Sequence, residues 1–350
     1  MMYSYSGINQ ALVGLSKELL KKGVWRKTPG FQSENSNRCL EFPFPVTVEI
    51  KNPSARVVRI PERKWNSILP FAESLWLALG WNDLDELPGK YVKSLYTFSD
   101  DGRTWRAGYG PRIRFYNDSR EQYDIPNKFN PSGSVDQLRY VVELLKKDPY
   151  TRQALITIHD PLKDSNIDLE TKDQPCTRSI HFMLSPKNEL NCYVTMRSND
   201  LLWGFSAVNV FNFTFMQEYV ARLLGVKIGK YYHIAHNFHI YEKFLPRIKE
   251  FAKYDLKEVS KLDNDFINCS APFEFVRNIK EFNLALVEVL AFQERAFKKD
   301  MSGLEELKEI NEFQRRDGFF IQWALAFYMH SMEKETREYV TKYNMNLQYL

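Results

Sequence analysis

The sequence has few cysteines, and their spacing excludes two kinds of site. The 350 residues include four cysteines, at positions 39, 176, 192 and 269. None forms a Cys-x-x-Cys pair or stands at a Cys/His spacing typical of zinc, so a disulfide framework and a zinc site are not expected. Such sparse cysteine usage is typical of a reducing compartment, and we expect a cytoplasmic protein.

Long apolar runs are also missing. No stretch of about 18 apolar residues occurs, and positions 1–6 lack a charged segment followed by an apolar one, so neither membrane spanning nor secretion is expected. No internal repeat and no linker rich in proline or glycine divides the chain. Hydrophobic residues make up 44% of the sequence, which is enough for one large core, and we expect a single domain over residues 1–350.

Charge of one sign is nowhere concentrated. The formal net charge is +4, the isoelectric point is about 8.6, and no long run of lysine and arginine occurs. This mild excess of positive charge suits a small anionic ligand and also weak contact with nucleic acid. Charge alone does not decide between the two.

The most informative stretch runs over residues 174–241 and begins with Cys176. This cysteine follows Pro175, which favours extended backbone before it, and it precedes a strand-like run over residues 179–184. A cysteine at such a strand entrance is placed to project its sulfur into a cleft. On spacing alone, an ordinary small buried side chain explains Cys176 equally well.

A second strand-like run covers residues 189–196, and a turn at 185–188 separates it from the first. The pattern predicts a hairpin that returns Arg197 towards Cys176. A nearby fixed cation lowers the pKa of a thiol from about 8.5, and Arg178 and Arg197 are the candidate cations.

Polar side chains follow the second strand. The guanidinium of Arg197 suits a phosphate, the hydroxyl of Ser198 adds a donor, and Asp200 opens a turn that ends at Gly204. A solvent-exposed loop is the usual explanation of such a run.

A helix is predicted from residue 210 to 224. Asn209 stands at its expected N-cap, where a capping role is the simplest explanation. The amide of Asn209 also carries the donor and acceptor needed to read a uracil edge.

These motifs resemble the thymidylate synthase and pyrimidine nucleotide hydroxymethylase family. The similarity lies in Pro-Cys at 175–176, Arg-Ser-x-Asp at 197–200, Gly204, Asn209 and His-x-Tyr at 239–241, in the family's order. It covers roughly residues 40–245. The resemblance implies an α+β fold in which a mixed sheet packs against helices. Helical patterns at 273–297, 304–315 and 319–343 then predict that residues 246–350 form a helical C-terminal extension.

The resemblance implies a role for four catalytic residues. Cys176 would be the nucleophile. Glu73, an acid inside an apolar helix predicted over residues 68–80, would organise the water that handles protons at O4 of the pyrimidine; a buried structural ion pair is the rival account. Tyr109 would lie near the C5 proton, and Asp200 would serve both catalysis and cofactor binding.

The cofactor implied by the resemblance is 5,10-methylenetetrahydrofolate. Asp200, Trp76 and Trp203 are its expected contacts. A folate and a pyrimidine nucleoside monophosphate would therefore be the small-molecule partners, and neither a metal nor a membrane is expected.

The resemblance also implies which residues bind the phosphate, the base and the sugar of the nucleotide. Arg197 and Ser198 would hold the phosphate, Asn209 would read the base, and His239 with Tyr241 would bind the sugar hydroxyl. In a homodimer, Arg152 would cross to the partner's phosphate, although the family's second arginine is replaced here by Gln153. A further phosphate arginine is expected from an N-terminal loop, and Arg26 and Arg38 are both candidates.

In the implied reaction, Cys176 adds to C6 of the pyrimidine, and C5 becomes able to accept a one-carbon unit. Hydride from the folate then gives a methyl group, whereas water gives hydroxymethyl. Two departures from thymidylate synthases favour water: Thr177 replaces the usual histidine after the nucleophile, and residues 342–350 lack the Pro-His-Pro motif of a closing tail. We expect hydroxymethylation of dUMP or UMP.

Several alternatives stay open. Reductive methylation of dUMP, as in thymidylate synthase proper, is the nearest. A cytosine nucleotide hydroxymethylase is another. One extra residue stands after Gly204, and if Val208 rather than Asn209 occupies the base-reading position, the choice of uracil is unsupported. A non-catalytic nucleotide- or RNA-binding relative would not need the thiol, and a metal-dependent hydrolase would need a clustered ligand set.

Overall fold

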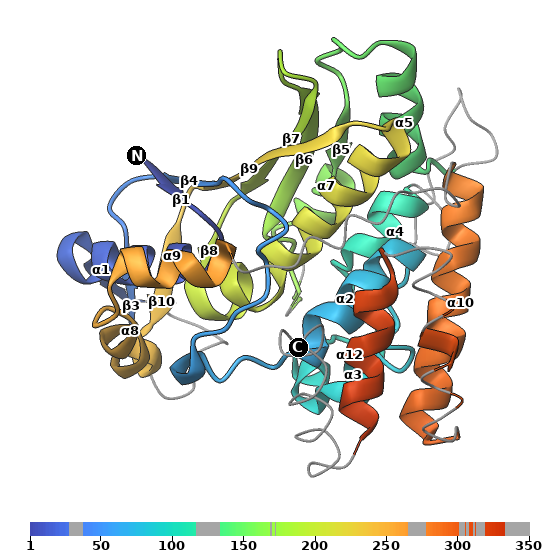
Figure 1. Ribbon diagram of the computed structural model, residues 1–350. Coiled ribbons are helices and arrows are strands. Elements are labelled where there is room, and N and C mark those ends of the chain that lie inside the picture. Colours follow the sequence, from blue (N-terminus) through green and yellow to red (C-terminus); the bar gives the residue numbers. More distant parts are fainter. Residues whose placement is uncertain are drawn as a thin grey trace.

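The computed structural model describes residues 1–27, 38–116, 134–168, 170–171, 173–264, 278–300 and 319–332, with residues 305, 308–310 and 312 between the last two ranges. Its strands form a larger and a smaller sheet (Figure 1). The larger has the order β1 (Met2–Tyr5), β4 (Val46–Ile50), β9 (Lys227–Ala235), β7 (Glu189–Met196), β6 (Thr177–Leu184) and β5 (Leu155–Thr157). The smaller has the order β2 (Val24–Lys27), β3 (Arg38–Glu41), β10 (Phe238–Tyr241) and β8 (Asn199–Asp200).

Helices pack against both sheets. The longer ones are α1 (Ile8–Lys22), α2 (Ile68–Leu79), α5 (Gln137–Lys147), α7 (Val210–Leu224), α9 (Leu256–Asn264), α10 (Ile279–Lys298) and α12 (Ile321–Ser331). Short ones are η1 (Pro61–Arg63), α3 (Pro88–Tyr91), η2 (Lys93–Phe98), α4 (Tyr109–Arg114), α6 (Pro161–Asp164), η4 (Leu201–Asn209), η5 (Glu242–Phe244) and α8 (Leu245–Phe251). The mixture of parallel and antiparallel strands with packed helices confirms the expected α+β class.

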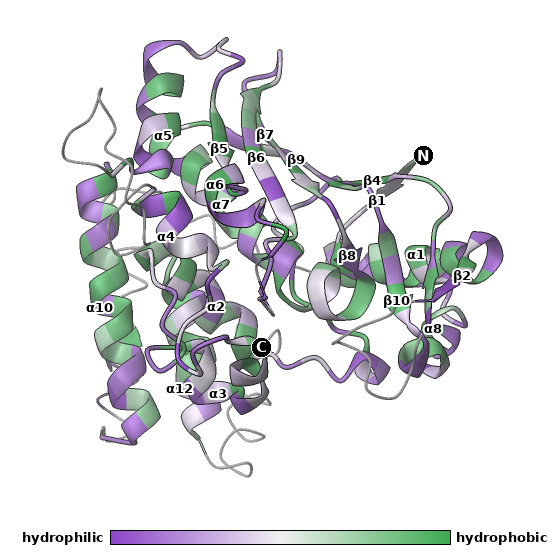
Figure 2. Ribbon diagram, turned by 180° about the vertical axis from the view of Figure 1, so that it is seen from behind, coloured by the Kyte–Doolittle hydropathy of each residue, from purple (hydrophilic) through white to green (hydrophobic). Residues whose placement is uncertain are grey.

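Local sequence patterns predicted many of these elements. The hairpin of β6 and β7 forms as expected, with its antiparallel pairs running from Thr177 with Met196 to Leu184 with Leu190. Helix α2 stops at Gly80, whose φ of 80° is left-handed and is readily adopted by glycine. Helix α5 buries its apolar stripe, and its hydrophobic and hydrophilic faces are visible in Figure 2.

The sequence pattern over residues 230–241 predicts one strand, but the structure has two. β9 belongs to the larger sheet and β10 to the smaller, and the break falls at His236 and Asn237. The strand next to it is interrupted at the same height in the sheet, between β7 and β8. The alternation of side chains did not reveal this break, because sheet pairing elsewhere in the molecule decides where the chain changes sheets.

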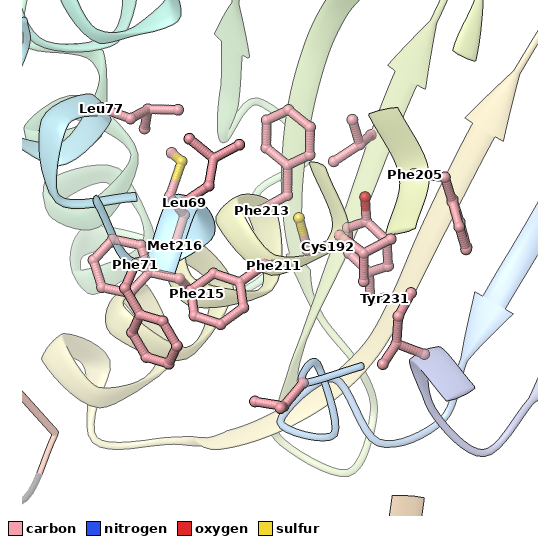
Figure 3. Packing of buried hydrophobic residues seen from close by; sticks show 14 of the residues in the cluster. Leu69, Phe71, Leu77, Cys192, Phe205, Phe211, Phe213, Phe215, Met216 and Tyr231 are labelled. Carbon is pink, nitrogen blue, oxygen red and sulfur yellow. The ribbon is translucent and has the colours of Figure 1, made fainter. Parts of the chain in front are cut away.

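The core lies between the larger sheet and α2, with α7 in the middle. Figure 3 shows Phe211, Phe213 and Phe215 of α7 among buried residues of α2 and the sheet. The rings of Phe211 and Phe71 meet edge to face at 4.8 Å, a favourable aromatic geometry. This packing fixes α2 and α7, which carry polar residues of the site.

The C-terminal helices pack on the same helix pair. α12 lies beside α10 and contacts α2 (Figure 1). Trp323 packs edge to face on Phe71 at 5.6 Å, and its indole N–H donates to Ser74 Oγ at 2.9 Å. The helical expectation therefore holds at 279–298 and 321–331. Most of 304–315, all of 333–343 and the tail at 342–350 lie outside the described residues.

The many charged residues between Asp160 and Asp173 predict a solvated loop, but Asp164 and its partners do not fit that prediction. Asp164 is buried, and its carboxylate pairs with buried Arg112 at 2.6 Å and with Arg106 at 3.2 Å. The pairing compensates the cost of burying the charges, and it fastens this segment beside α4.

Candidate active site

The breaks in the two neighbouring strands bring the candidate site residues together. Backbone hydrogen bonds join the breaks directly: Asn237 N donates to Arg197 O at 3.2 Å, and Asn199 N donates to Asn237 O at 2.8 Å. Because neither strand continues at this level, the side chains of Arg197 and Ser198 leave the regular sheet pattern. The polar residues 197–200 therefore lie where the chain passes from the larger sheet to the smaller one.

Arg197 holds the loop that carries the cysteine, as the hairpin predicted. Its backbone N–H donates to Cys176 O at 2.9 Å. Its guanidinium donates from Nε to Pro175 O and from Nη2 to Gln174 O, each at 3.1 Å. These bonds fix both the cation and the backbone before the thiol.

The Cys176 thiol is half-buried, and the effect on its pKa differs from expectation. Burial raises this pKa above its ordinary value, although the positive charges of Arg197 and Arg178 oppose the shift. The expected net lowering is not observed, because desolvation of the thiolate outweighs the two cations. The thiol is therefore the resting form at neutral pH.

Asp173 is a site residue that sequence reasoning missed. Its carboxylate accepts from Ala107 N at 2.8 Å, and burial raises its pKa to about 6. Its negative charge also contributes to the raised pKa of Cys176. The sequence offers one indication, an acid three positions before the nucleophile, but the charges around it predict a solvated segment instead.

Arg178 occupies an irregularity in β6. The register with β7 shifts between Thr177 and Ser179, and such a bulge redirects a side chain. Arg178 is half-buried, and burial together with the charge of Arg197 lowers its pKa. Among the described residues, no carboxylate forms an ion pair with it.

Tyr109 lies beside the nucleophile, at the start of α4. Its hydroxyl accepts from Thr177 N at 3.1 Å, and its ring stacks on Phe213 with centroids 6.3 Å apart. Burial raises the pKa of Tyr109, so its phenol stays protonated at neutral pH. The hydroxyl of Thr177 is buried without a hydrogen-bond partner among the described residues.

Glu73 is the buried acid of α2. One oxygen accepts from Asn212 Nδ2 at 2.9 Å, and burial raises the pKa of Glu73 to about 7. The Oδ1 atom of Asn212 is buried and has no partner among the described residues. Asn212 was missed by sequence reasoning, although a polar residue inside the apolar α7 run was a usable indication.

Trp76 follows on the same helix and is 2% exposed. Its indole N–H donates to Asp83 O at 2.8 Å, and its ring meets Trp105 edge to face. The structure therefore places Trp76 in the core beneath the site, and its contact with a cofactor stays a prediction.

Asp200 caps the helical segment η4. Its Oδ1 accepts from Leu202 N at 2.7 Å and also from Trp203 N, whereas its buried Oδ2 has no partner among the described residues. Burial raises the pKa of Asp200. Trp203 is 49% exposed, and its ring meets Phe244 at 6.3 Å. A buried acceptor beside an exposed indole suits a ligand with N–H donors and a flat ring system.

The predicted helix over residues 210–224 is confirmed as α7, but the expected capping role of the Asn209 side chain is wrong. Residues 201–209 form a π-helix that runs directly into α7, and Asn209 has helical backbone angles without a capping bond. The wider π turn accommodates the extra residue after Gly204. Asn209 Nδ2 reaches Met196 Sδ at 3.8 Å, at the end of β7, while Val208 packs against the core.

His239 and Tyr241 lie on β10, with their rings edge to face at 5.2 Å. The Nδ1 atom of His239 is 2.7 Å from Asn237 Oδ1, and burial lowers the pKa of His239. His239 pairs with Asp200 across β10 and β8, which places the two residues on adjacent strands.

The two candidate phosphate arginines of the N-terminal region, Arg26 and Arg38, both form ion pairs. Arg26 pairs with Glu41 at 2.5 Å, whereas Arg38 pairs with Glu242 and covers the ring of Trp25 at 4.8 Å. Most of the loop expected to carry the phosphate arginine, residues 28–37, lies outside the described residues.

Arg152 stands apart from the other site residues. It is exposed on the connection before β5, and its carbonyl lies 3.2 Å from His181 Nε2. Within the part of the chain that the structure describes, no hydrogen bond or ion pair joins it to the Cys176 loop.

Within the described ranges, no group of three or more His, Cys, Asp or Glu side chains is arranged to hold a metal ion. None of the helices in those ranges combines the length and the apolar character needed to cross a membrane.

Comparison with known proteins gives a consistent result. Residues 18–297 match the family described as thymidylate synthase. A deoxyuridylate hydroxymethyltransferase of Bacillus phage SP01 is 42% identical over 242 residues, which cover 69% of this chain and 59% of that protein. One of Pseudomonas phage M6 is 33% identical over 245 residues, covering 70% and 63%.

Thymidylate synthases themselves are more distant. That of Malacoplasma penetrans (strain HF-2) is 27% identical over 118 residues, covering 34% of this chain and 39% of that protein. The alignment spans about three fifths of the length of each of the two phage relatives above, at 59% and 63%.

Proposed function

Because the chain belongs to the thymidylate synthase family, we propose that it transfers a one-carbon unit to C5 of dUMP and releases the 5-hydroxymethyl nucleotide. The observation that carries the proposal is the placement of Cys176. A half-buried thiol lies on a loop held by Arg197 and beside the hydroxyl of Tyr109, as a covalent nucleophile for a pyrimidine requires.

The chemistry of the nucleotide begins at Cys176. The thiolate forms a bond to C6, and the electron pair of the C5–C6 double bond moves towards O4, so that C5 becomes nucleophilic. After C5 has accepted the one-carbon unit, loss of the C5 proton and breakage of the bond between that carbon and its carrier nitrogen leave an exocyclic methylene on the ring, and the carrier departs as the free amine. The oxygen of water adds to that methylene, the C6–S bond breaks, and the thiolate leaves.

Glu73 and Tyr109 are the residues that handle protons during the reaction. A pKa of about 7 lets Glu73 exist in both protonation states near neutral pH, so it can deliver and recover a proton through water at O4. Tyr109 accepts from Thr177 N and keeps its own proton to donate. It therefore orients a water molecule at C5 rather than serving as the final proton acceptor.

Methylenetetrahydrofolate, when bound, supplies the one-carbon unit, and the residues around Asp200 fit it. The buried, unpartnered Oδ2 of Asp200 suits a ring N–H donor, and the exposed indole of Trp203 suits stacking. Trp76 would act through the packing beneath this surface.

The phosphate is assigned to Arg197, Ser198 and Arg178. Arg197 and Arg178 carry like charges close together, and the pKa of Arg178 is lowered, so a phosphate between them would relieve repulsion. Arg178 would replace one contact that Gln153 cannot make.

Arg152 would contribute from a second subunit in a homodimer. Support comes from the face of the larger sheet opposite α7, where Tyr193 and Tyr232 are half-buried and stack with centroids 4.8 Å apart. This face, with exposed Leu155 on β5, lies on the side of the sheet next to Arg152 and suits burial against another copy.

The hydroxymethyl product is favoured over methyl by Thr177 after the nucleophile and by the names of the phage relatives. Asn209 supports uracil, because its amide reaches the end of β7 while Val208 faces the core. Reductive methylation, as in thymidylate synthase, is the second candidate and is favoured by the family match.

Tritium release from C5-labelled dUMP, UMP, dCMP and CMP, with methylenetetrahydrofolate present, tests the proposal. We expect release from dUMP and a product whose mass is that of the 5-hydroxymethyl nucleotide. A 5-methyl product would assign thymidylate synthase activity, and release from a cytosine nucleotide would overturn the base assignment. No release from any of the four, with nucleotide bound, would indicate a binding protein.

A further inference from the structure

A hydrogen-bond chain crosses the smaller sheet and joins Arg26, one of the two candidate phosphate arginines of the N-terminal region, to Ser198 and His239. It starts at Arg26 on β2, passes through the buried carboxylate of Glu41 on β3, and reaches Asn237 at the break before β10. From Asn237 it divides to Ser198 and His239. Neither Glu41 nor Asn237 has a role in the function proposed above.

Glu41 is the centre of this chain. It is 3% exposed, and its two oxygens serve different partners. Oε1 accepts from Arg26 Nε at 2.5 Å, and Oε2 accepts from Asn237 Nδ2 at 2.6 Å. A buried carboxylate shared in this way needs both donors, because losing either leaves charge uncompensated.

The carboxylate decides the orientation of the Asn237 amide. Only the NH₂ group can face Glu41, so Oδ1 faces the opposite way. There it accepts from Ser198 Oγ at 3.2 Å and lies 2.7 Å from His239 Nδ1. Two candidate substrate-binding side chains are therefore fixed by one amide oxygen.

The same argument decides the tautomer of His239. Because Asn237 Oδ1 can only accept, His239 Nδ1 must carry the proton. Burial keeps the imidazole neutral by lowering its pKa, against the nearby charges of Asp200 and Glu41. Nε2 is then left as an acceptor, to which a sugar hydroxyl can donate.

We propose that Glu41 and Asn237 are positioning residues that set Arg26, Ser198 and His239 together for a nucleoside monophosphate. The carboxylate of Glu41 determines the orientation of the Asn237 amide. That orientation determines both the position of the Ser198 hydroxyl and the tautomer of His239. The inference rests on the proposed function for the identity of the nucleotide, and it predicts effects on nucleotide affinity rather than on the chemical step.

Variants that exchange the donor and the acceptor between Glu41 and Asn237 test the proposed hydrogen-bond chain. Asn237→Asp places a second carboxylate against Glu41, and we expect the Kd for dUMP to rise by about tenfold or more. Adding Glu41→Gln to Asn237→Asp restores complementarity, because the Gln amide donates to the new Asp and its oxygen accepts from Arg26. We expect the double variant to return to within about threefold of wild type.

Glu41→Gln alone should raise the Kd by only about two- to fivefold, because its amide cannot satisfy Arg26 and Asn237 at once. The control is Asn52→Asp, the same change at an exposed turn residue, which should leave the Kd unchanged. The split between KM and kcat adds a second readout: tritium release should show a raised KM with kcat within about twofold.

Two results would overturn the proposal. One is a folded Asn237→Asp variant with unchanged Kd, and the other is a folded double variant that stays as weak as Asn237→Asp. If Asn237→Asp does not fold, Glu41→Ala removes the shared acceptor instead; a tenfold rise in Kd supports the chain and an unchanged Kd overturns it. Failure of wild-type protein to release tritium would contradict the proposed reaction only, because the Kd comparison needs no turnover.

Discussion

The candidate active site has a side that binds the nucleotide and a side that handles protons, and the two are built differently. On the nucleotide side, Arg197, Ser198 and His239 each bond to another part of the protein, so their positions are set before a ligand arrives. On the proton side, Asn212 and Asp200 each keep a buried oxygen without a partner among the described residues. Buried polar atoms normally find partners, so a ligand or water is expected to complete that side.

The difference indicates that the two sides serve different steps of the reaction. Preorganised groups bind and orient at little cost during the reaction, whereas groups that lack partners exchange protons and respond to what occupies the site. The pKa of about 7 at Glu73 belongs to the second kind. Substitutions on the nucleotide side should therefore change affinity, and those on the proton side should change turnover and pH dependence.

The largest effect is expected at Cys176, where the two sides meet. Cys176→Ser should lower tritium release by at least about 10⁴-fold, because a serine hydroxyl is a far weaker nucleophile at neutral pH. The Kd for dUMP should stay within about tenfold, since the nucleotide side is intact. Turnover that survives the change would contradict the covalent mechanism.

Glu73→Gln sharpens the contrast on the proton side. It keeps the hydrogen bond to Asn212 but removes the exchangeable proton, and we expect kcat to fall by about 10²-fold with little change in the Kd for dUMP. The limb of the pH–rate profile near pH 7 should disappear. A larger effect on Kd than on kcat would contradict the assignment of Glu73 to this side.

The same variant has a stability signature. The pKa of Glu73 is raised by folding, so this group favours the folded state below its unfolded pKa of 4.5, and that stability is lost as pH rises through about 7. Glu73→Gln should therefore stabilise the protein at pH 8, by up to about 3 kcal/mol, and have little effect at pH 4.5. Thermal unfolding at both pH values, with exposed Glu86→Gln as the control, measures this.

A smaller effect is expected for the base. Asn209→Asp should shift preference from dUMP towards dCMP by about tenfold, because a carboxylate accepts from a 4-amino group but cannot donate to O4. Competition between the two nucleotides for tritium release measures the ratio. Val208→Thr is the matched control, and a shift there instead would move base reading by one residue.

The smallest effects concern the thiol. Asp173→Asn removes a charge that raises the pKa of Cys176, so alkylation by iodoacetamide at pH 7.5 should become about three- to tenfold faster. Arg197→Gln should make it slower, because a charge that lowers the pKa is lost. Equal rates in both variants would show that burial alone determines the reactivity of Cys176.

Local pattern was sufficient for elements that bury one clear face. The hairpin of β6 and β7 and the helix carrying Glu73 follow directly from periodicity and turn residues. The approach of Arg197 to Cys176 follows from the hairpin alone, because its length and turn determine which residues lie opposite.

What sequence could not supply depends on tertiary packing. The pKa of Cys176 is governed by burial, which the spacing of charges does not reveal. The side chain of Asn209 does not cap α7 because a π turn runs directly into the helix, and this turn leaves the apolar pattern unchanged. Asn237 joins residues of three strands at the break between sheets, a position that no single stretch of sequence shows.

The most direct test of the covalent reaction is the intact mass of the protein after incubation with 5-fluoro-dUMP and methylenetetrahydrofolate. Fluorine at C5 cannot leave as a proton does, so the adduct should persist. We predict a stable mass increase equal to the nucleotide plus the folate, mapped by peptide analysis to Cys176 and absent from Cys176→Ser. No adduct, or an adduct on another cysteine, would contradict the account.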